Sequence, residues 1–156
     1  MFDQFSDRAR MVVFLARVVA GYQGATEIGN EHLLEGVIRE DAPTRLLHPY
    51  NEGNVRVSPH PPFFGDSTAH ELLAELNSLS PNHGPIQTNV DMPISSGLGR
   101  TFAGAVALAN DSRSRNIEPL HLLAGIIQCD ADICERLHRH GVKLDAVVAA
   151  IGSSGQ

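Results

Sequence analysis

The sequence predicts an all-α protein in which two related four-helix repeats form one eight-helix, bundle-like domain over residues 1–156. Three observations support this prediction. Apolar residues recur at helical spacing, the sequence matches itself after a fixed shift, and no extended run has an evident strand partner. The length of 156 residues, with 42% hydrophobic and 19% charged residues, suits one globular domain whose core needs neither disulfides nor metals.

The internal repeat is visible when the sequence is compared with itself at a shift of 89 positions, the distance from His32 to His121. Identical residues then coincide in two long segments, which chance does not readily explain. The matches divide the chain into a first repeat at about 1–80, a linker at 81–94 and a second repeat at about 95–152. Matched pairs include Ser6/Ser95, Ala16/Ala105, Ala20/Ala109, Ile28/Ile117, Leu33/Leu122, Gly36/Gly125 and Asp41/Asp130.

The first repeat begins with two predicted helices. Ser6 can cap a helix that ends at Gly21 to Gly24, where two glycines and a short polar stretch stop the apolar periodicity. Asn30 is the expected N-cap of a second helix over Glu31 to Glu40. The large aliphatic residues of this helix recur at i, i+1, i+4 and i+5, which predicts one buried stripe.

An irregular insertion is expected at residues 48–66, because its four prolines and two glycines prevent a continuous helix. A helix then resumes over Thr68 to Leu79 and closes the first repeat. The run from Ile86 to Val90 in the linker has an extended composition but no evident pairing partner, so no sheet is predicted.

The second repeat shows the four-helix pattern more completely. Its third helix is predicted over Ala131 to His140, with Ile133 and Leu137 facing inward and a stop at Gly141. The apolar residues that mark its first, second and fourth helices are Phe102, Ala105, Val106 and Ala109; Leu122, Leu123, Ile126 and Ile127; and Leu144, Val147, Val148 and Ile151.

Charge and hydropathy exclude several classes of protein. A formal net charge of −6 without a Lys/Arg run argues against nucleic acid or an anionic membrane as partner. The apolar stretch from Met11 to Ala20 is interrupted by Arg17 and is too short to span a membrane, and the acidic residues before it do not suit a signal peptide. A cytoplasmic location is therefore expected, with Cys129 and Cys134 as free thiols.

Two segments of the first repeat resemble a known family. They are Met1-Phe2-Asp3-Gln4-Phe5-Ser6-Asp7-Arg8-Ala9-Arg10 and Ile28-Gly29-Asn30-Glu31-His32-Leu33-Leu34-Glu35-Gly36-Val37-Ile38. Both are similar to the Clp repeat of the N-terminal domain of Clp ATPases, closest to the ClpC and ClpA type. The second repeat is eroded: residues 95–100 lack the Arg-Ala pair, and Glu118-Pro119-Leu120 replaces the usual Gly-Thr-Glu. The resemblance covers most of the chain outside residues 48–66.

The resemblance implies a function in protein recognition. In that family the double repeat is an eight-helix domain with pseudo-twofold symmetry that recruits substrates or adaptors to an unfoldase and its protease. This sequence contains no G-x-x-x-x-G-K-[ST] motif to hold a nucleotide, so we expect a stand-alone, non-catalytic module without a cofactor. The implied partners are protein substrates, degron peptides or adaptors, and Clp ATPase subunits.

Some family members recognise phosphoarginine, and the resemblance implies a ligand site here as well. A helix N-terminus suits the phosphate, and a carboxylate suits the guanidinium. The matching residues are Phe2, Ser6 and Glu31 in the first repeat. The second repeat keeps Ser95 but has Leu120 in place of the carboxylate, so that site is expected to be degenerate unless Glu118 reaches into it.

Other interpretations of single features remain open. The recurrent His32 and His121 are expected to be structural, each bonding a backbone group of its own repeat. Cys134 and His138 share a helix face, but their spacing is not that of a known zinc finger. Family members bind cyclic peptide antibiotics near the residue matching Phe2, which leaves a small-molecule site between the repeats conceivable.

The insertion itself supports an alternative function. Tyr50, Phe63 and Phe64 offer apolar anchors beside a rigid, proline-rich backbone, so the protein would be a scaffold or regulator that is unrelated to proteolysis. The competing expectation is that these aromatic side chains fold back onto the helices.

Overall fold

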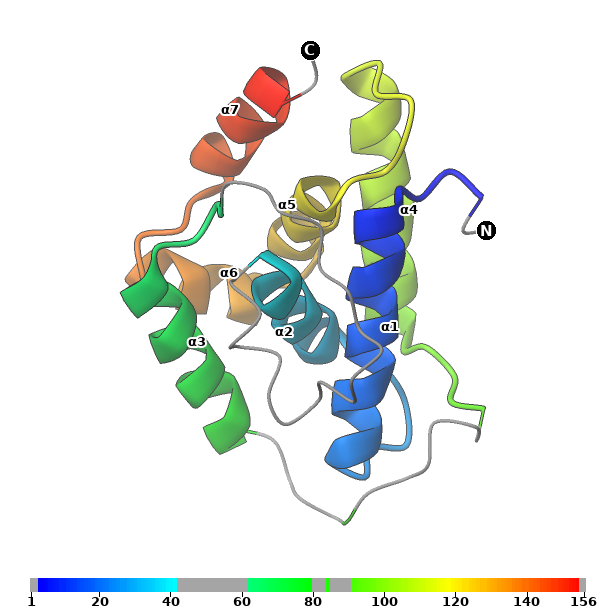
Figure 1. The fold of residues 1–156 in the computed structure, drawn as a ribbon, viewed down its shortest axis with the longest axis vertical. Coiled ribbons are helices and arrows are strands. Elements are labelled where there is room, and N and C mark those ends of the chain that lie inside the picture. The colour runs from blue at the N-terminus through cyan, green and yellow to red at the C-terminus, as the bar shows by residue number, and fades with distance from the viewer. Residues whose placement is uncertain (1–2, 42–61, 80–83, 85–90, 155–156) are drawn as a thin grey trace.

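The structure is a computed structural model that describes residues 3–41, 62–79, 84 and 91–154 (Figure 1). These residues form seven helices and no strand, which confirms the all-α prediction for the described part of the chain. Residues 42–50 of the first repeat match residues 131–139 of the second repeat at the shift of 89, and they lie outside the described residues. The helices are α1 (Asp7–Tyr22), α2 (Asn30–Asp41), α3 (Asp66–Leu79), α4 (Ser96–Asp111), α5 (Pro119–Cys129), α6 (Ala131–Arg139) and α7 (Leu144–Ser154).

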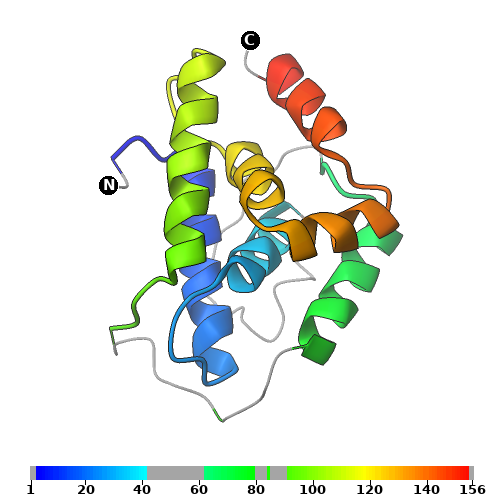
Figure 2. The ribbon, with the colours of Figure 1, turned by 180° about the vertical axis from the view of Figure 1, so that it is seen from behind.

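The two repeats meet through their second helices. α1 packs mainly on α2, and α4 packs on α5 in the same way, while α2 and α5 also contact each other. α3 packs on α2, and α6 and α7 pack on α5, so these three helices lie on the outside of the bundle (Figures 1 and 2). One continuous cluster of buried apolar side chains runs through both repeats. α2 is buried along almost its entire length, including all of its charged residues except Glu31.

Two short backbone contacts relate the repeats by an approximate twofold exchange. Phe5, which precedes α1, forms an isolated parallel bridge with Ile117, which precedes α5. Ile94, which precedes α4, forms the equivalent bridge with Ile28, which precedes α2. Each repeat therefore places the start of its long helix against the second helix of the other repeat. The sequence analysis predicted the repeats but not these crossed contacts.

A glycine in the second helix of each repeat brings the paired helices close together. A Cβ atom on Gly36 would lie 2.5 Å from the Val12 carbonyl oxygen, and one on Gly125 would lie 2.7 Å from the Thr101 carbonyl oxygen. Both distances are far shorter than van der Waals contact, so only glycine permits this approach of the helices. A shift of 89 residues relates Gly36 to Gly125 and Val12 to Thr101, so the same contact occurs in both repeats.

The N-caps of the two long helices are confirmed. The Ser6 hydroxyl accepts a hydrogen bond from the Ala9 N–H at 3.1 Å, and the Ser95 hydroxyl accepts one from the Leu98 N–H at 3.0 Å. Both serines have extended backbone conformations, as an N-cap requires. The sequence therefore placed the start of α1 and of α4 correctly.

Asn30 is not the N-cap of α2, and this prediction was wrong. The Gly29 carbonyl accepts the Leu33 N–H at 3.1 Å, so Gly29 holds the cap position. Asn30 is the first helical residue, is buried, and accepts a hydrogen bond at 2.7 Å from the Thr101 hydroxyl of the other repeat. A short polar side chain suits both a cap and a buried link between repeats, so the sequence alone did not separate the two roles.

The long helices end in equivalent turns that contain different residues. After α1, Gly24 has φ 70°, and the Ala25 N–H bonds to the Ala20 carbonyl. After α4, Arg113 takes the matching position with φ 56°, and the Ser114 N–H bonds to the Ala109 carbonyl. This left-handed conformation costs a non-glycine residue about 1–2 kcal/mol.

Replacing Arg113 with glycine should therefore stabilise the domain by about 0.5–1 kcal/mol, the relief of strain being partly offset by greater chain entropy in the unfolded state. Urea unfolding monitored by circular dichroism measures the change. Gly24→Ala is the matched control and should destabilise the domain, because it introduces at the first repeat the strain that Arg113 carries at the second. Equal stability of Arg113→Gly and the wild type would contradict this prediction.

The end of the insertion folds back onto the helices. The Asp41 carboxylate accepts the N–H groups of Phe63 at 2.7 Å and Phe64 at 2.9 Å, and Phe64 is buried in the core. Neither aromatic ring is therefore a freely exposed anchor, and Tyr50 lies outside the described residues. α3 begins at Asp66, two residues before the predicted start.

The last two helices follow the predicted pattern with one exception. Ile133 and Leu137 of α6 are buried, and the chain turns at Gly141 with φ 80°. In α7, Val147 is buried but Val148 is 47% exposed, so Val148 does not belong to the inward stripe. Among the helices of the described residues, none combines the length and the hydrophobicity needed to cross a membrane.

Candidate functional site

The start of each long helix lies beside the second helix of the other repeat. The Ser95 N–H donates to the Ile28 carbonyl at 2.8 Å, which places the start of α4 next to the start of α2. The Ser6 N–H donates to the Ile117 carbonyl at 3.0 Å, which places the start of α1 next to the start of α5. Each of these two ends of the domain is thus composed of residues from both repeats.

This arrangement separates Ser6 from Glu31, which the sequence analysis had grouped in one site. Ser6 caps the start of α1, whereas the neighbour of Glu31, His32, has its Nε2 atom 3.2 Å from Oε1 of Gln23 at the other end of α1. α1 has 16 residues, so at about 1.5 Å per residue the two ends are roughly 24 Å apart. Ser6 and Glu31 are too far apart to contact one phosphoarginine side chain.

The structure instead brings Glu31 to the same end as Ser95, and Ser6 to the same end as Leu120. The repeat alignment identified which residues are equivalent, but it gave no information on which repeat supplies the partner. The remaining predicted ligand residue, Phe2, lies outside the described residues.

The start of α4 has several features that favour an anion. Its first turn has no acidic residue, whereas the first turn of α1 contains Asp7. A Cβ atom on Gly97 would lie 3.3 Å from Nδ2 of Asn30 and 3.8 Å from Nη2 of Arg100, so polar side-chain groups lie close to this partly exposed backbone. The Thr101 hydroxyl donates to the amide oxygen of Asn30, and the Asn30 NH₂ group donates one of its two hydrogens to Asp130. One N–H of this group is left as a donor. Backbone dipole and side-chain donors both favour negative charge here.

Glu31 lies at the rim of a pocket of about 490 Å³, which we call the acidic pocket. The Glu31 side chain is half-exposed, and its Oε1 atom lies 3.8 Å from Nδ1 of His32. Leu76 and Leu79 of α3 and Ile133 of α6 supply apolar surface. The pocket is lined by Gln23, Gly24, Ala25, Thr26, Glu27, Glu31, His32, Leu76, Leu79, Asp130, Asp132, Ile133 and Arg136.

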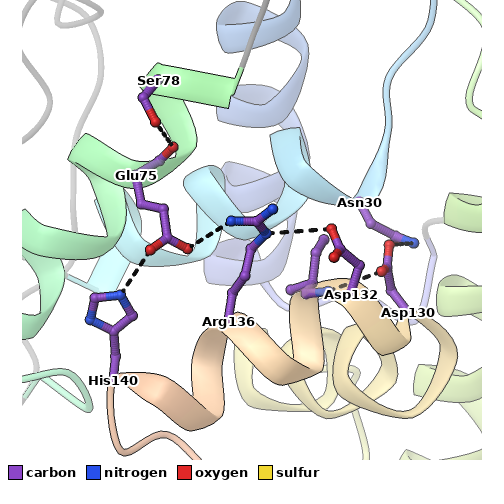
Figure 3. Close-up of polar contacts among 8 residues, drawn as sticks. Asn30, Glu75, Ser78, Asp130, Asp132, Arg136 and His140 are labelled. Atoms are coloured by element: carbon purple, nitrogen blue, oxygen red, sulfur yellow. Dashed lines mark hydrogen bonds and ion pairs between the residues drawn. The ribbon is translucent and has the colours of Figure 1, made fainter.

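An ion-pair network connects the wall of the acidic pocket to α3 (Figure 3). Arg136 of α6 contacts Glu75 at 3.3 Å and Asp132 at 3.4 Å, and His140 contacts Glu75 at 3.3 Å. Burial alone would raise the pKa of Glu75, but hydrogen bonds from His140 and Arg136 outweigh burial and lower this pKa. The network holds the first repeat's last helix against α6 and fixes Arg136 at the pocket, where its charge is already matched by carboxylates.

Asp130 links the network to the start of α2. One carboxylate oxygen accepts the Ile133 N–H at 3.1 Å as the N-cap of α6, and the other lies 3.3 Å from Nδ2 of Asn30 (Figure 3). Asn30, the first residue of α2, therefore contacts both α4 and the N-cap residue of α6. The sequence analysis missed this residue as part of the site because it had been interpreted as a cap.

The predicted structural role of the recurrent histidines is confirmed. The Gly29 N–H donates to Nδ1 of His32 at 2.9 Å, and the Glu118 N–H donates to Nδ1 of His121 at 2.9 Å. Each histidine thereby caps its own helix from the third helical position, where glutamate or glutamine is usual. Burial lowers the pKa of His32 and of His121, and the nearby Glu31 and Glu118 only partly oppose that effect.

The other composite end lacks an equivalent of Glu31. Leu120 occupies that position and is partly buried against the core. Glu118 is the N-cap residue of α5, so its backbone is held in the cap. Elsewhere, Sγ of Cys134 lies 3.8 Å from Nε2 of His138, and the described residues contain no group of three or more metal-ligating side chains.

These features define a two-repeat helical domain in which each composite end combines residues of both repeats. Residues 4–140 match the family described as the Clp repeat (R) N-terminal domain, and the chain belongs to this family. The predicted family resemblance is confirmed, whereas the ClpC or ClpA type remains a prediction. A comparison with curated proteins gave no significant match.

Solved structures with the same fold extend over nearly the whole chain. A chain from a study of a malarial protein secretion system is 16% identical, with a TM-score of 0.71 and coverage of 97% of this chain and 94% of that chain. The N-terminal domain of the Caseinolytic protease associated chaperone ClpD from Arabidopsis thaliana is 21% identical (TM-score 0.64; coverage 96% and 93%). The Hsp104 N-terminal domain from Candida albicans is 17% identical (TM-score 0.65; coverage 98% and 93%).

Proposed function

We propose that this protein is a non-catalytic, cytoplasmic recognition module that binds substrates, degron peptides or adaptors of a Clp unfoldase. Membership of the Clp repeat family supports this class of function. Within this class, we propose phosphoarginine as the recognised group. Its phosphate would lie at the start of α4, and its guanidinium would pair with Glu31.

The crossed arrangement of the repeats is the observation that carries this proposal. It brings a helix N-terminus without acidic residues, two side-chain donors and a half-exposed carboxylate to one end of the domain. Phosphoarginine has an anionic and a cationic group on one side chain, so it matches this pairing. The other composite end, near Ser6 and Glu118, does not offer both an anion site and a matching carboxylate. The first turn of α1 contains Asp7, and Leu120 stands at the position that matches Glu31.

Isothermal titration calorimetry with a phosphoarginine-containing peptide tests the proposal. Glu31→Gln should weaken binding at least tenfold, which corresponds to about 1.4 kcal/mol, whereas Glu118→Gln at the other end should leave the affinity unchanged. Arg100→Ala should weaken binding of the phosphorylated peptide but not of its unphosphorylated form. Undiminished affinity of Glu31→Gln would remove Glu31 from the site.

The alternative function, a scaffold that binds partners through the insertion, has weaker support. Phe64 is buried in the core and Phe63 is held by its backbone at Asp41, so two of the three proposed anchors are already engaged. A variant without residues 51–62 distinguishes the two functions, because the recognition module should retain its ligands and the scaffold should lose them.

A further inference from the structure

The acidic pocket has a counterpart at the other composite end. A second pocket, of about 830 Å³, is lined in part by Ser112, Arg113, Ser114, Arg115, Asn116, Leu120 and His121. Adding 89 to the numbers of seven residues of the acidic pocket, residues 23–27 and 31–32, gives these seven positions. The two pockets are therefore equivalent surfaces of the two repeats, and differences between them reflect the divergence of the repeats.

The charges at these equivalent positions are reversed. Glu31 is replaced by Leu120, Glu27 by Asn116, and Thr26 by Arg115. The acidic pocket also contains Asp132 of α6 and Asp130, the N-cap residue of that helix, whereas the second pocket contains Arg8 of α1. The first surface thus suits a cation, and the second does not.

Two arginines at the second pocket have no side-chain partner among the residues that the structure describes. The guanidinium groups of Arg113 and Arg115 are exposed and make no hydrogen bond or ion pair within the described part of the chain. In contrast, Arg8 is already bound through both Nε and Nη2 to Glu40, at 2.8 and 2.9 Å. Arg113 also keeps a left-handed backbone conformation for which the other repeat uses Gly24. The positive charge available to a ligand is therefore concentrated on residues 113–115.

Two acidic residues, Asp41 and Glu118, also line this pocket, and both interact electrostatically with Arg8. The Asp41 carboxylate is held in place by the backbone N–H groups of Phe63 and Phe64. No ion pair joins Arg113 or Arg115 to either carboxylate within the described part of the chain. The rest of the lining is mainly apolar, with Val37, Phe63, Phe64, Leu120 and Ile151.

We propose that this second pocket, the basic pocket, binds a peptide segment of a partner protein in which acidic side chains flank a large apolar residue. The apolar residue would lie against Leu120 and the aromatic side of the pocket, and the acidic residues would pair with Arg113 and Arg115. The two ends of the domain then select segments of opposite charge. This inference does not rest on phosphoarginine binding at Glu31.

Fluorescence anisotropy with the full chain and a labelled peptide of alternating glutamate and leucine tests this proposal. The double variant Arg113→Ala/Arg115→Ala should weaken binding of this peptide at least tenfold. The control Arg139→Ala/Lys143→Ala removes the same charge from exposed positions outside the pocket and should change the affinity less than twofold. Equal losses in both double variants would overturn the proposal, because they would indicate only an effect of net charge.

Two further variants separate this pocket from the rest of the molecule. Leu120→Glu restores the acid of the first repeat and should abolish binding of the glutamate–leucine peptide, whereas Glu31→Gln should leave it unchanged. A peptide with serine in place of leucine should bind at least tenfold more weakly. Equal binding of the two peptides would contradict a role for the apolar lining.

Sedimentation of the unliganded protein tests a different occupant. The proposal expects the wild type and Arg113→Ala/Arg115→Ala to have the same oligomeric state. A wild-type dimer that this double variant converts to monomers would show that a second copy of the chain occupies the pocket, and it would overturn the proposal.

Discussion

Replacing Gly36 with alanine should destabilise the domain by about 3 kcal/mol, and Gly125→Ala should have a similar effect. The new Cβ atom would lie 2.5 Å from the Val12 carbonyl oxygen in the first case and 2.7 Å from the Thr101 carbonyl oxygen in the second. Each neighbour is backbone in the middle of a helix and cannot rotate away. Relief therefore requires the two helices to separate, which loosens the core between them. Urea unfolding gives the free energy of unfolding of each variant.

Gly99→Ala is the matched control, because Gly99 also lies within a helix but a Cβ atom added there would have no neighbouring atom within 4 Å. This variant should be more stable than the wild type by about 0.5–1 kcal/mol, since alanine has the higher helix propensity. Opposite signs for Gly36→Ala and Gly99→Ala would identify close packing, rather than helix propensity, as the cause. Wild-type stability of Gly36→Ala would contradict the close approach of α1 and α2.

The sequence predicted the local structure well because local signals determine it. Ser6 and Ser95 are followed by long amphipathic runs, and each is an N-cap. The turn at Gly141 likewise requires a left-handed conformation that glycine adopts readily. The matching positions of Gly36 and Gly125 indicated that the repeats are equivalent. The requirement for glycine at these positions, however, comes from the close approach of α1 to α2 and of α4 to α5, which the sequence does not show.

The composite ends were not predictable in the same way. An internal repeat shows that Ser6 matches Ser95 and that Glu31 matches Leu120, but a twofold exchange allows either repeat to supply the partner at each end. Only the bridges at Phe5 and Ile28 resolve this choice. The candidate residues were thus identified individually, whereas their grouping required the tertiary structure.

Lowering the pH from 7.5 to 5.5 should destabilise the domain through His32 and His121. Burial lowers the pKa of both imidazoles in the folded state. Each Nδ1 atom accepts a backbone N–H, from Gly29 or Glu118, so a proton on that nitrogen would break the cap. The nearby carboxylates of Glu31 and Glu118 favour the protonated form but do not reverse the shift.

The direction of this effect follows from proton binding. At pH 7.5, well above the ordinary histidine pKa of about 6.5, both imidazoles are mostly neutral in the folded and unfolded chains, and the stabilisation is nearly complete. As the pH falls below this value, the unfolded chain binds protons that the folded chain does not, so the free energy of unfolding decreases. The loss is at most about 1.4 kcal/mol per pH unit for each histidine. Urea unfolding at several pH values measures it.

The variant His32→Gln/His121→Gln separates this titration from all others in the chain. Glutamine at the third helical position can accept the same backbone N–H through its amide oxygen, so the caps persist without a titratable group. The variant should lose the histidine component of the pH dependence between pH 7.5 and 5.5, while the dependence that arises from carboxylates at lower pH remains unchanged. An identical pH dependence in the variant and the wild type would assign the effect to other groups and leave the two imidazoles a purely structural role.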